Sequence, residues 1–220
     1  MKNFPSLLLT LCVFTIPLAA QEKKAAETAG KDWVPLLSAE TKSLDENWTT
    51  TGNWMLMDGV ATLTPREGET GWSRWTAYLW SKKKYTDFEI EFDYRVKKGG
   101  NSGFYFRVGD VNDPVAQGIE VQIYDSAPGK PENALTDHDS GGIIPGLKPR
   151  KNAAKETGEW NKMKVRNHDG KIIVTLNGVT VNTLDVSEGG ALATRPETGP
   201  IGFQDHALPI SLRNIRIREL

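Results

Sequence analysis

Two polar side chains in residues 118–125 (GIEVQIYD) are the best suited to chemistry in this sequence. Successive side chains of a strand point to opposite faces, so Glu120 and Gln122 share one face and the apolar residues around them share the other. A carboxylate beside an amide on a sheet can bind the hydroxyl groups of a sugar or transfer protons. An ordinary solvated strand face has the same pattern, so the spacing alone leaves both interpretations open.

A second candidate lies in residues 99–108 (GGNSGFYFRV), where three glycines precede a predicted strand. Glycine permits a positive φ or the close approach of another group. On a continuous strand Arg107 shares a face with Tyr105. Its guanidinium offers a fixed fork of donors to an oxyanion or a hydroxyl group. The alternative is a tight turn followed by a surface arginine.

Each of the three histidines adjoins an aspartate, and two of them are candidates for chemistry. His138 is followed by Asp139, and His206 is preceded by Asp205. A neighbouring carboxylate can orient an imidazole or join it as a metal ligand. His168 lies in a predicted turn, where we interpret it as solvated. No H-x-x-x-H spacing is present, so the sequence predicts no definite cofactor and leaves a divalent metal ion open.

Six of the seven tryptophans lie before residue 81. Exposed tryptophans can stack against sugar rings, but tryptophan also fills protein cores. We expect most of them to be in the core. Trp72 and Trp75, in the polar stretch GWSRW, are predicted to be the most exposed pair.

The elements that must position these residues are predicted to be strands. Residues 87–96 (DFEIEFDYRV) alternate between apolar and charged side chains, which predicts a strand with one buried and one solvated face. Asn177-Gly178 and Asp58-Gly59 predict hairpin turns, because these residues tolerate a positive φ. About ten to twelve short strands and no convincing amphipathic helix predict an all-β sandwich. The other clear strand patterns are residues 76–80, 104–108, 119–124, 162–167, 172–176, 179–184, 201–204 and 210–220.

The composition excludes several classes of protein. The 220 residues carry 27 Lys+Arg against 28 Asp+Glu, so no nucleic-acid partner is expected. An apolar fraction of 38% argues against disorder as the main state. No apolar run after residue 20 approaches the roughly 20 residues that span a bilayer. We therefore expect no transmembrane segment once the N-terminal segment is removed.

The N-terminus resembles a secretory signal peptide. Lys2 supplies a positive charge, residues 7–18 are almost entirely apolar, and Ala19-Ala20 offers a cleavage site. We therefore expect the mature protein to be secreted or periplasmic. The predicted organisation is a signal peptide at 1–20, a flexible linker at 21–31 and one domain at 32–220.

An ordered set of short motifs resembles a known family. The motifs are NSGFYFR (101–107), GIEVQIYD (118–125), SGGI (140–143), GEWN (158–161), LNG (176–178), GPIGFQDH (199–206) and RNIRIREL (213–220). In this order, and over residues 33–220, they resemble the 3-keto-disaccharide hydrolase family. The resemblance implies a concanavalin-like jelly-roll β-sandwich of two antiparallel sheets, with a carbohydrate pocket on a concave sheet face.

The resemblance also implies a substrate class and a set of pocket residues. Family members are linked to the cleavage of glycosides oxidised at sugar carbon 3. We therefore predict an exported carbohydrate-active enzyme that cleaves 3-keto-glycosides by hydrolysis or by elimination and hydration. The motif positions assign catalytic roles to Glu120, His138 and Arg107. They assign substrate binding to Asn101, Gln122, Asp139, Gln204 and His206.

Ordinary two-carboxylate glycoside hydrolysis fits this sequence poorly. Laminarinase-like enzymes carry acids on one strand in a pattern close to E-x-D-x-x-E, whereas here Gln122 replaces the middle acid and Glu120 and Asp125 fall on opposite faces. A ketone at carbon 3 acidifies the proton on carbon 2, so a single base is sufficient. We expect Glu120 or His138 to be this base, and Arg107, with or without a metal ion, to stabilise the enolate oxygen.

Two other functions stay open at this stage: a non-catalytic carbohydrate-binding module, and a structural or interaction domain of the cell surface. After Ser140-Gly141 the family usually has a small residue and an aromatic one, whereas here Gly142-Ile143-Ile144 follow. One wall of the pocket is therefore expected to differ. The sugar, the linkage and the oligomeric state are not determined by the sequence.

Overall fold

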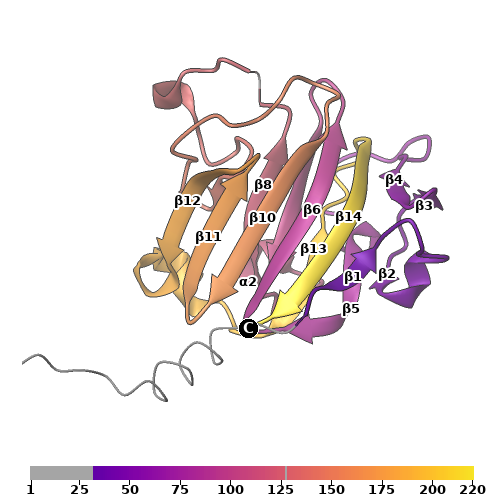
Figure 1. The fold of residues 1–220 in the computed structure, drawn as a ribbon, viewed down its shortest axis with the longest axis horizontal. Coiled ribbons are helices and arrows are strands. Elements are labelled where there is room, and N and C mark those ends of the chain that lie inside the picture. The colour runs from indigo at the N-terminus through magenta and orange to yellow at the C-terminus, as the bar shows by residue number, and fades with distance from the viewer. Residues whose placement is uncertain (1–31, 127) are drawn as a thin grey trace, which may run out of the picture. The chain divides into compact units, whose positions relative to one another are not determined.

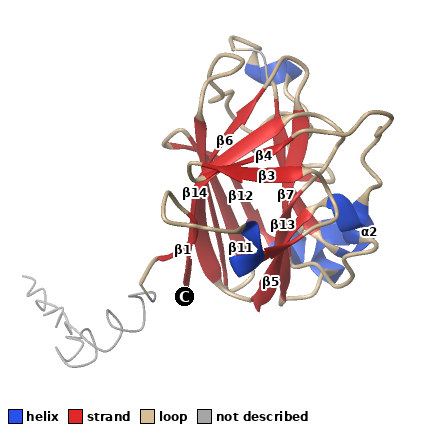
Figure 2. Cartoon of the chain, turned by 90° about the vertical axis from the view of Figure 1, so that its right-hand side faces the viewer, coloured by secondary structure: helices blue, strands red, loops and turns tan. Residues whose placement is uncertain are grey.

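The structure is a computed structural model that describes residues 32–126 and 128–220. The predicted signal peptide (1–20) and linker (21–31) lie outside these residues. Within the described chain, two antiparallel sheets pack face to face (Figures 1 and 2), which confirms the predicted all-β jelly-roll sandwich. The described residues contain no helix that is both long and apolar enough to cross a membrane.

The larger sheet places β6 at its centre, between β10 and β14 (Figure 1). Its strands, in spatial order, are β12 (Val179–Asp185), β11 (Lys171–Leu176), β10 (Asn161–His168), β6 (Phe88–Val96), β14 (Ile210–Glu219), β4 (Val60–Leu63) and β3 (Trp54–Met57), with β1 (Val34–Leu37) also paired to β14.

The smaller sheet carries the strands on which the site residues were predicted. Its strands, in spatial order, are β2 (Trp48–Thr49), β5 (Leu79–Tyr85), β13 (Gly199–Phe203), β7 (Asn101–Phe106), β8 (Ile119–Tyr124) and β9 (Ile143–Ile144). The helical segments in the described chain are short: α2 (Pro114–Gln117) and the 3-10 turns Leu44–Glu46, Trp75–Ala77, Glu132–Ala134, Val186–Glu188 and Gly190–Thr194.

The core lies between the two sheets and is rich in aromatic rings. Phe92 of the larger sheet packs against Phe104 and Phe203 of the smaller one, with ring centroids 5.3 and 5.0 Å apart. Rings at these distances and tilts combine large apolar burial with favourable edge-to-face contact. The apolar halves of the alternating strands therefore join the sheets and leave the other halves for the outer faces.

The outer face of β6 is less solvated than its alternation predicted. Glu89 is only 4% exposed, because long basic side chains from the neighbouring strands cover it. Arg218 Nε donates to Glu89 at 2.7 Å, Arg166 at 3.2 Å, and Lys164 Nζ lies 3.3 Å away. Burial opposes the ionisation of Glu89, but these cations outweigh burial and lower its pKa.

Both predicted hairpins are confirmed, since all four residues at Asp58-Gly59 and Asn177-Gly178 have positive φ. The short strands β1, β2 and β9 were not predicted. The strand predicted at residues 76–80 is wrong in its first half, because Trp75–Ala77 forms a 3-10 turn and the strand begins at Leu79.

The long irregular segment after β8 is fixed to the sandwich by Ser140. The Ser140 hydroxyl donates to the Tyr124 carbonyl at 2.8 Å and accepts from the Tyr124 N–H at 2.9 Å. It also accepts from the buried hydroxyl of Tyr94 at 2.9 Å, which connects the segment to the larger sheet. One hydroxyl therefore joins this loop to both sheets.

We expect Ser140→Ala to lower the free energy of unfolding by about 1–3 kcal/mol, because it leaves the buried Tyr94 hydroxyl without a partner. Urea unfolding measures this loss. Tyr94→Phe removes the group that would be stranded, so the double variant should lose less stability than the two single variants combined. Simple additivity would contradict this role for Ser140.

Candidate active site

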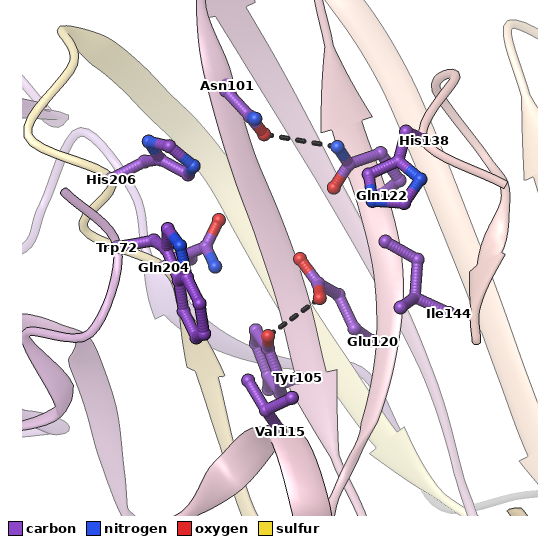
Figure 3. A pocket seen from close by; sticks show the side chains of 10 residues that line it. All are labelled: Trp72, Asn101, Tyr105, Val115, Glu120, Gln122, His138, Ile144, Gln204 and His206. Carbon is purple, nitrogen blue, oxygen red and sulfur yellow. Dashed lines mark hydrogen bonds between the residues drawn. The ribbon is translucent and has the colours of Figure 1, made fainter.

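A pocket opens on the outer face of the smaller sheet, where β7, β8 and β9 form its floor (Figure 3). Segments from other parts of the chain form its walls. The residues that line it are Trp72, Asn101, Tyr105, Val115, Glu120, Gln122, His138, Ile144, Gln204 and His206.

Strand pairing places the floor residues in a row across the sheet. Tyr105 on β7 pairs with Gly202 on one side and with Glu120 of β8 on the other. Glu120 in turn pairs with Ile144 of β9. Side chains directly opposite one another on adjacent strands lie on the same face, so Glu120 is flanked by a tyrosine and an isoleucine.

The Glu120 carboxyl lies against the sheet and is almost hidden from water. It is 7% exposed, and its Oε2 accepts a 2.6 Å hydrogen bond from the Tyr105 hydroxyl (Figure 3). The side chain extends over Gly103, where a β-carbon would come within 2.0 Å of Oε1. Glycine is therefore required at position 103 for this carboxyl to occupy its place.

Gln122 binds the polar groups beside Glu120. In one orientation its amide nitrogen donates to the Asn101 side chain at 3.1 Å. In the opposite orientation the nitrogen donates to the Ser102 carbonyl at 2.9 Å and to Glu120 Oε1 at 3.2 Å. The second orientation places the Gln122 oxygen 3.1 Å from Asn101 Oδ1, so the Asn101 amide must turn as well and present its nitrogen as the donor. In that arrangement both carboxyl oxygens of Glu120 accept a hydrogen bond, one from Tyr105 and one from Gln122.

Burial raises the pKa of Glu120 to about 7, because the charged form loses its contact with water. The hydrogen bond from Tyr105 and the proximity of His138 act in the opposite direction, and Asp137 adds to the rise. Burial, and then the charge of Glu120, raise the pKa of the Tyr105 hydroxyl, which therefore remains a donor. Glu120 is thus a carboxyl that can hold or release a proton near neutral pH.

One wall of the pocket follows the end of β13. The Gln204 N–H donates to the Gly103 carbonyl at 2.9 Å, and the Gln204 carbonyl accepts from the Ser102 hydroxyl at 2.8 Å. These bonds fix the backbone beside β7. The Gln204 side-chain oxygen is buried without a hydrogen-bond partner. A buried acceptor without a partner in a pocket is available to a ligand that donates.

Trp72 forms a second part of this wall and is 46% exposed. Its carbonyl accepts from the Tyr78 hydroxyl at 2.9 Å, and its ring packs on Trp75 with centroids 5.3 Å apart. Arg74 lies 3.3 Å from the buried carboxylate of Asp205, which connects the Trp72 segment to the segment that carries His206. Trp72 is therefore supported from two sides.

The opposite wall comes from the long loop after β8. His138 Nδ1 lies 2.8 Å from the Asp137 carboxylate, whose other oxygen accepts from the Gly146 N–H at 2.7 Å. Burial raises the pKa of Asp137, but the bonds from Gly146 and His138 outweigh burial and lower it. An ionised Asp137 can orient the imidazole of His138 toward the pocket.

Asp139 does not line the pocket. It is buried inside the loop, where Lys130 contacts it at 2.7 Å and the Thr136 N–H donates to it at 2.8 Å. Burial opposes its ionisation, but Lys130 and Thr136 outweigh this effect and lower its pKa. Its position indicates that Asp139 folds the loop that presents His138, so its predicted place in the pocket is wrong.

Arg107 also lies outside the pocket, so its predicted place beside Glu120 is wrong. β7 ends at Phe106, and Arg107 has a φ of +53°, which ends the alternation that would have placed it beside Tyr105. Its guanidinium donates instead to the carbonyls of Pro196 at 2.9 Å and Arg195 at 3.3 Å. It borders a different pocket, near Glu197.

Arg107 supports the pocket indirectly, because one of the carbonyls that it binds belongs to Arg195. The Arg195 side chain donates to three carbonyls at and after α2, those of Val115, Ala116 and Gly118. Because α2 is a single short turn, these bonds fix its position more than its own hydrogen bonds can. Val115, which is 41% exposed, is thereby held at one end of the pocket.

The pocket does not gather a cluster of metal-ligand side chains. Within residues 32–126 and 128–220, the group of three potential ligands is Asp87, His168 and Asp169, at a different place in the sandwich. The acid Glu120 and the two pocket histidines do not approach one another closely enough to form such a group. The chemistry available in the pocket is therefore that of one acid, two histidines and three amides.

Six of the eight predicted site residues line the pocket together. Sequence reasoning missed Trp72, Tyr105, Val115 and Ile144 as lining residues. Tyr105 carried a usable signal, because it lies on the same face of the predicted sheet as Glu120, and Trp72 was predicted to be exposed. No pattern in the sequence marks Val115. The six that line the pocket are Asn101, Glu120, Gln122, His138, Gln204 and His206.

This fold and this pocket define a carbohydrate-active β-sandwich. Residues 32–218 match the family described as 3-keto-alpha-glucoside-1,2-lyase-like domain, and the chain belongs to that family. A 3-keto-disaccharide hydrolase of Bacteroides thetaiotaomicron is 25% identical over 230 residues, which cover 87% of this chain and 73% of the relative.

Solved structures show the same fold. A putative glycosyl hydrolase from Parabacteroides distasonis has a TM-score of 0.72 and 28% identity, and the match covers 86% of this chain and all of that one. The carbohydrate-binding module CBM66 from Bacillus subtilis has a TM-score of 0.53 and 13% identity, and covers 87% of this chain and 98% of the module. The second likeness concerns the fold alone.

The raised pKa of Glu120 predicts a pH-dependent stability. An acid whose pKa is higher in the folded state contributes most below its unfolded value, 4.5, and this contribution is lost as the pH rises through about 7. The difference corresponds to about 3 kcal/mol at 1.36 kcal/mol per pKa unit. We therefore expect Glu120→Gln to gain about 3 kcal/mol relative to the wild type between pH 4 and pH 8.

Urea unfolding at pH 4, 6 and 8 measures this difference. Glu67→Gln, at an exposed position, serves as the matched control and should show no comparable trend. A difference between Glu120→Gln and the wild type that stays constant with pH would show that Glu120 does not titrate near neutrality.

Proposed function

We propose that this protein is an exported enzyme that cleaves 3-keto-glycosides in the pocket around Glu120. The observation that carries the proposal is the single buried carboxyl with a pKa of about 7. Of the described residues that line the pocket, Glu120 is the one carboxylic acid. Ordinary glycoside hydrolysis requires two carboxyl groups on either side of the scissile bond. A reaction with one base fits this residue set better.

Asp125 does not supply the missing second acid. It follows β8, and its carboxylate accepts hydrogen bonds from the Gly99 N–H at 2.9 Å and from the Thr157 hydroxyl at 2.6 Å. These bonds tie together loops beyond the end of the strand. This placement supports a mechanism in which Glu120 acts without a carboxylate partner.

In the proposed reaction, Glu120 removes the proton on carbon 2 of the sugar, and the electron pair of that C–H bond forms the enolate of the carbon 3 ketone. When the enolate collapses, the ketone is restored, a double bond forms between carbons 1 and 2, and the bond from carbon 1 to the leaving oxygen breaks. His138, oriented by Asp137, delivers a proton to the leaving oxygen. Addition of water across the double bond then gives the free 3-keto-sugar.

The amides around Glu120 are suited to hold the sugar during this reaction. Asn101 and Gln204 present amide groups within the pocket, while Gln122 holds Glu120 and Asn101 in place. They take over the role that the sequence assigned to Arg107, because a fixed amide N–H directed at the developing enolate oxygen stabilises its charge. His206 adds a further polar group on the wall that carries Gln204 (Figure 3).

We expect Glu120→Gln to retain the fold and to reduce turnover of a 3-keto-glucoside at least about 100-fold, the usual effect of losing a general base. For the wild type, kcat/KM should rise with pH through about 7, because the ionised carboxylate is the base. Product analysis by mass spectrometry, with and without a metal chelator, measures turnover and any need for a divalent ion. Near-normal turnover by Glu120→Gln would contradict the assignment.

The same assay separates the proposed enzyme from a binding module. Binding of a 3-keto-glucoside without any product would favour the module. Export is supported by the charge and apolar run of the first 20 residues. Sequencing the N-terminus of the protein recovered from the cell envelope or medium tests it, with Gln21 as the expected first residue.

A further inference from the structure

Polarity changes along the length of the pocket, and Glu120 lies at the change. Figure 3 shows Asn101, Gln122, His138 and His206 toward one end and Tyr105 and Val115 at the other, with Glu120 between them. Trp72 and Ile144 face each other across the pocket at the level of Glu120. One half can therefore bind hydroxyl groups, and the other presents mainly hydrocarbon surface.

The apolar half offers few polar groups to a sugar, and its one exposed side-chain donor is the indole N–H of Trp72. The Tyr105 hydroxyl is occupied by Glu120, and the residue is only 1% exposed, so Tyr105 forms the base of this half and offers a ligand little surface. Beneath the surface, Tyr105 packs with Tyr78 and Trp80 in an apolar cluster separate from the main core. A second sugar ring bound here would lose hydration of several hydroxyl groups, and these residues could replace little of it.

Two apolar side chains of this half are also unusually exposed to water. Trp72 and Val115 both belong to the few large hydrophobic residues of the described chain that remain exposed to water, at 46% and 41%. Neither is held loosely, since Tyr78 bonds the Trp72 carbonyl and Arg195 bonds the Val115 carbonyl. Rigid exposed apolar surface beside polar groups is typical of a ligand site.

We propose that this apolar half, formed by Trp72, Tyr105, Val115 and Ile144, is a subsite for an aromatic leaving group. The inference rests on the proposed function, because it places the oxidised sugar in the polar half and the scissile bond at Glu120. The leaving group then extends toward Val115 and contacts the exposed ring of Trp72, with Tyr105 beneath it. The substrate class is that of aryl 3-keto-glycosides, in preference to those with a hydrophilic second sugar.

The test compares the affinity of phenyl and methyl 3-keto-glucosides of the same anomeric configuration, measured by calorimetry on Glu120→Gln, in which turnover is suppressed. We expect the phenyl compound to bind at least about tenfold more tightly. Adding Val115→Ser should reduce this ratio about fivefold, whereas adding Val115→Ile should retain it. Val179→Ser, at an exposed valine of β12 that does not line the pocket, is the matched control and should leave the ratio unchanged.

A ratio near one, or a ratio that Val115→Ser does not change, would overturn the subsite. Turnover of both compounds by the wild type is scored separately and tests the proposed function. If neither compound is turned over but the phenyl preference depends on Val115, the proposed function fails and the apolar subsite stands. If both are turned over without preference, the subsite fails and the proposed function stands.

Discussion

The structure of the pocket depends on keeping one carboxyl group out of water. Removing a carboxylate from water is costly unless hydrogen bonds replace its hydration. Here the Tyr105 hydroxyl and the Gln122 amide supply those bonds from positions fixed by strand pairing. The remaining cost appears as the raised pKa of Glu120. The same burial that weakens the folded state near neutral pH makes this group able to exchange a proton there.

The walls of the pocket are built on loops, yet each is fixed by a charged or hydroxyl group outside the pocket. Arg195 holds α2, Asp139 folds the loop that carries His138, and Asp205 faces Arg74 behind Trp72. A site placed on loops loses precision unless such supports restrict its side chains. Residues that never contact a ligand therefore contribute to how well the pocket fits one.

Side-chain alternation predicted the strands and much of the floor, because a period of two is a local property of the chain. Glu120 and Gln122 followed directly from it. Arg107 did not, because a single positive φ ended the strand one residue before it, and nothing in FYFRV marks that change. The covering of Glu89 also depended on cations from other strands, which a single strand pattern does not contain.

Gly103 has a consequence for how this pocket can vary among related chains. A β-carbon there would lie 2.0 Å from the Glu120 carboxylate, so the absence of a side chain at one position and the presence of an acid at another are two parts of one requirement. A relative that replaces this glycine has to move its acid or lose it. The residue at position 103 can therefore distinguish sandwiches that retain the buried acid from those in which the same surface binds a ligand without an acid to transfer protons.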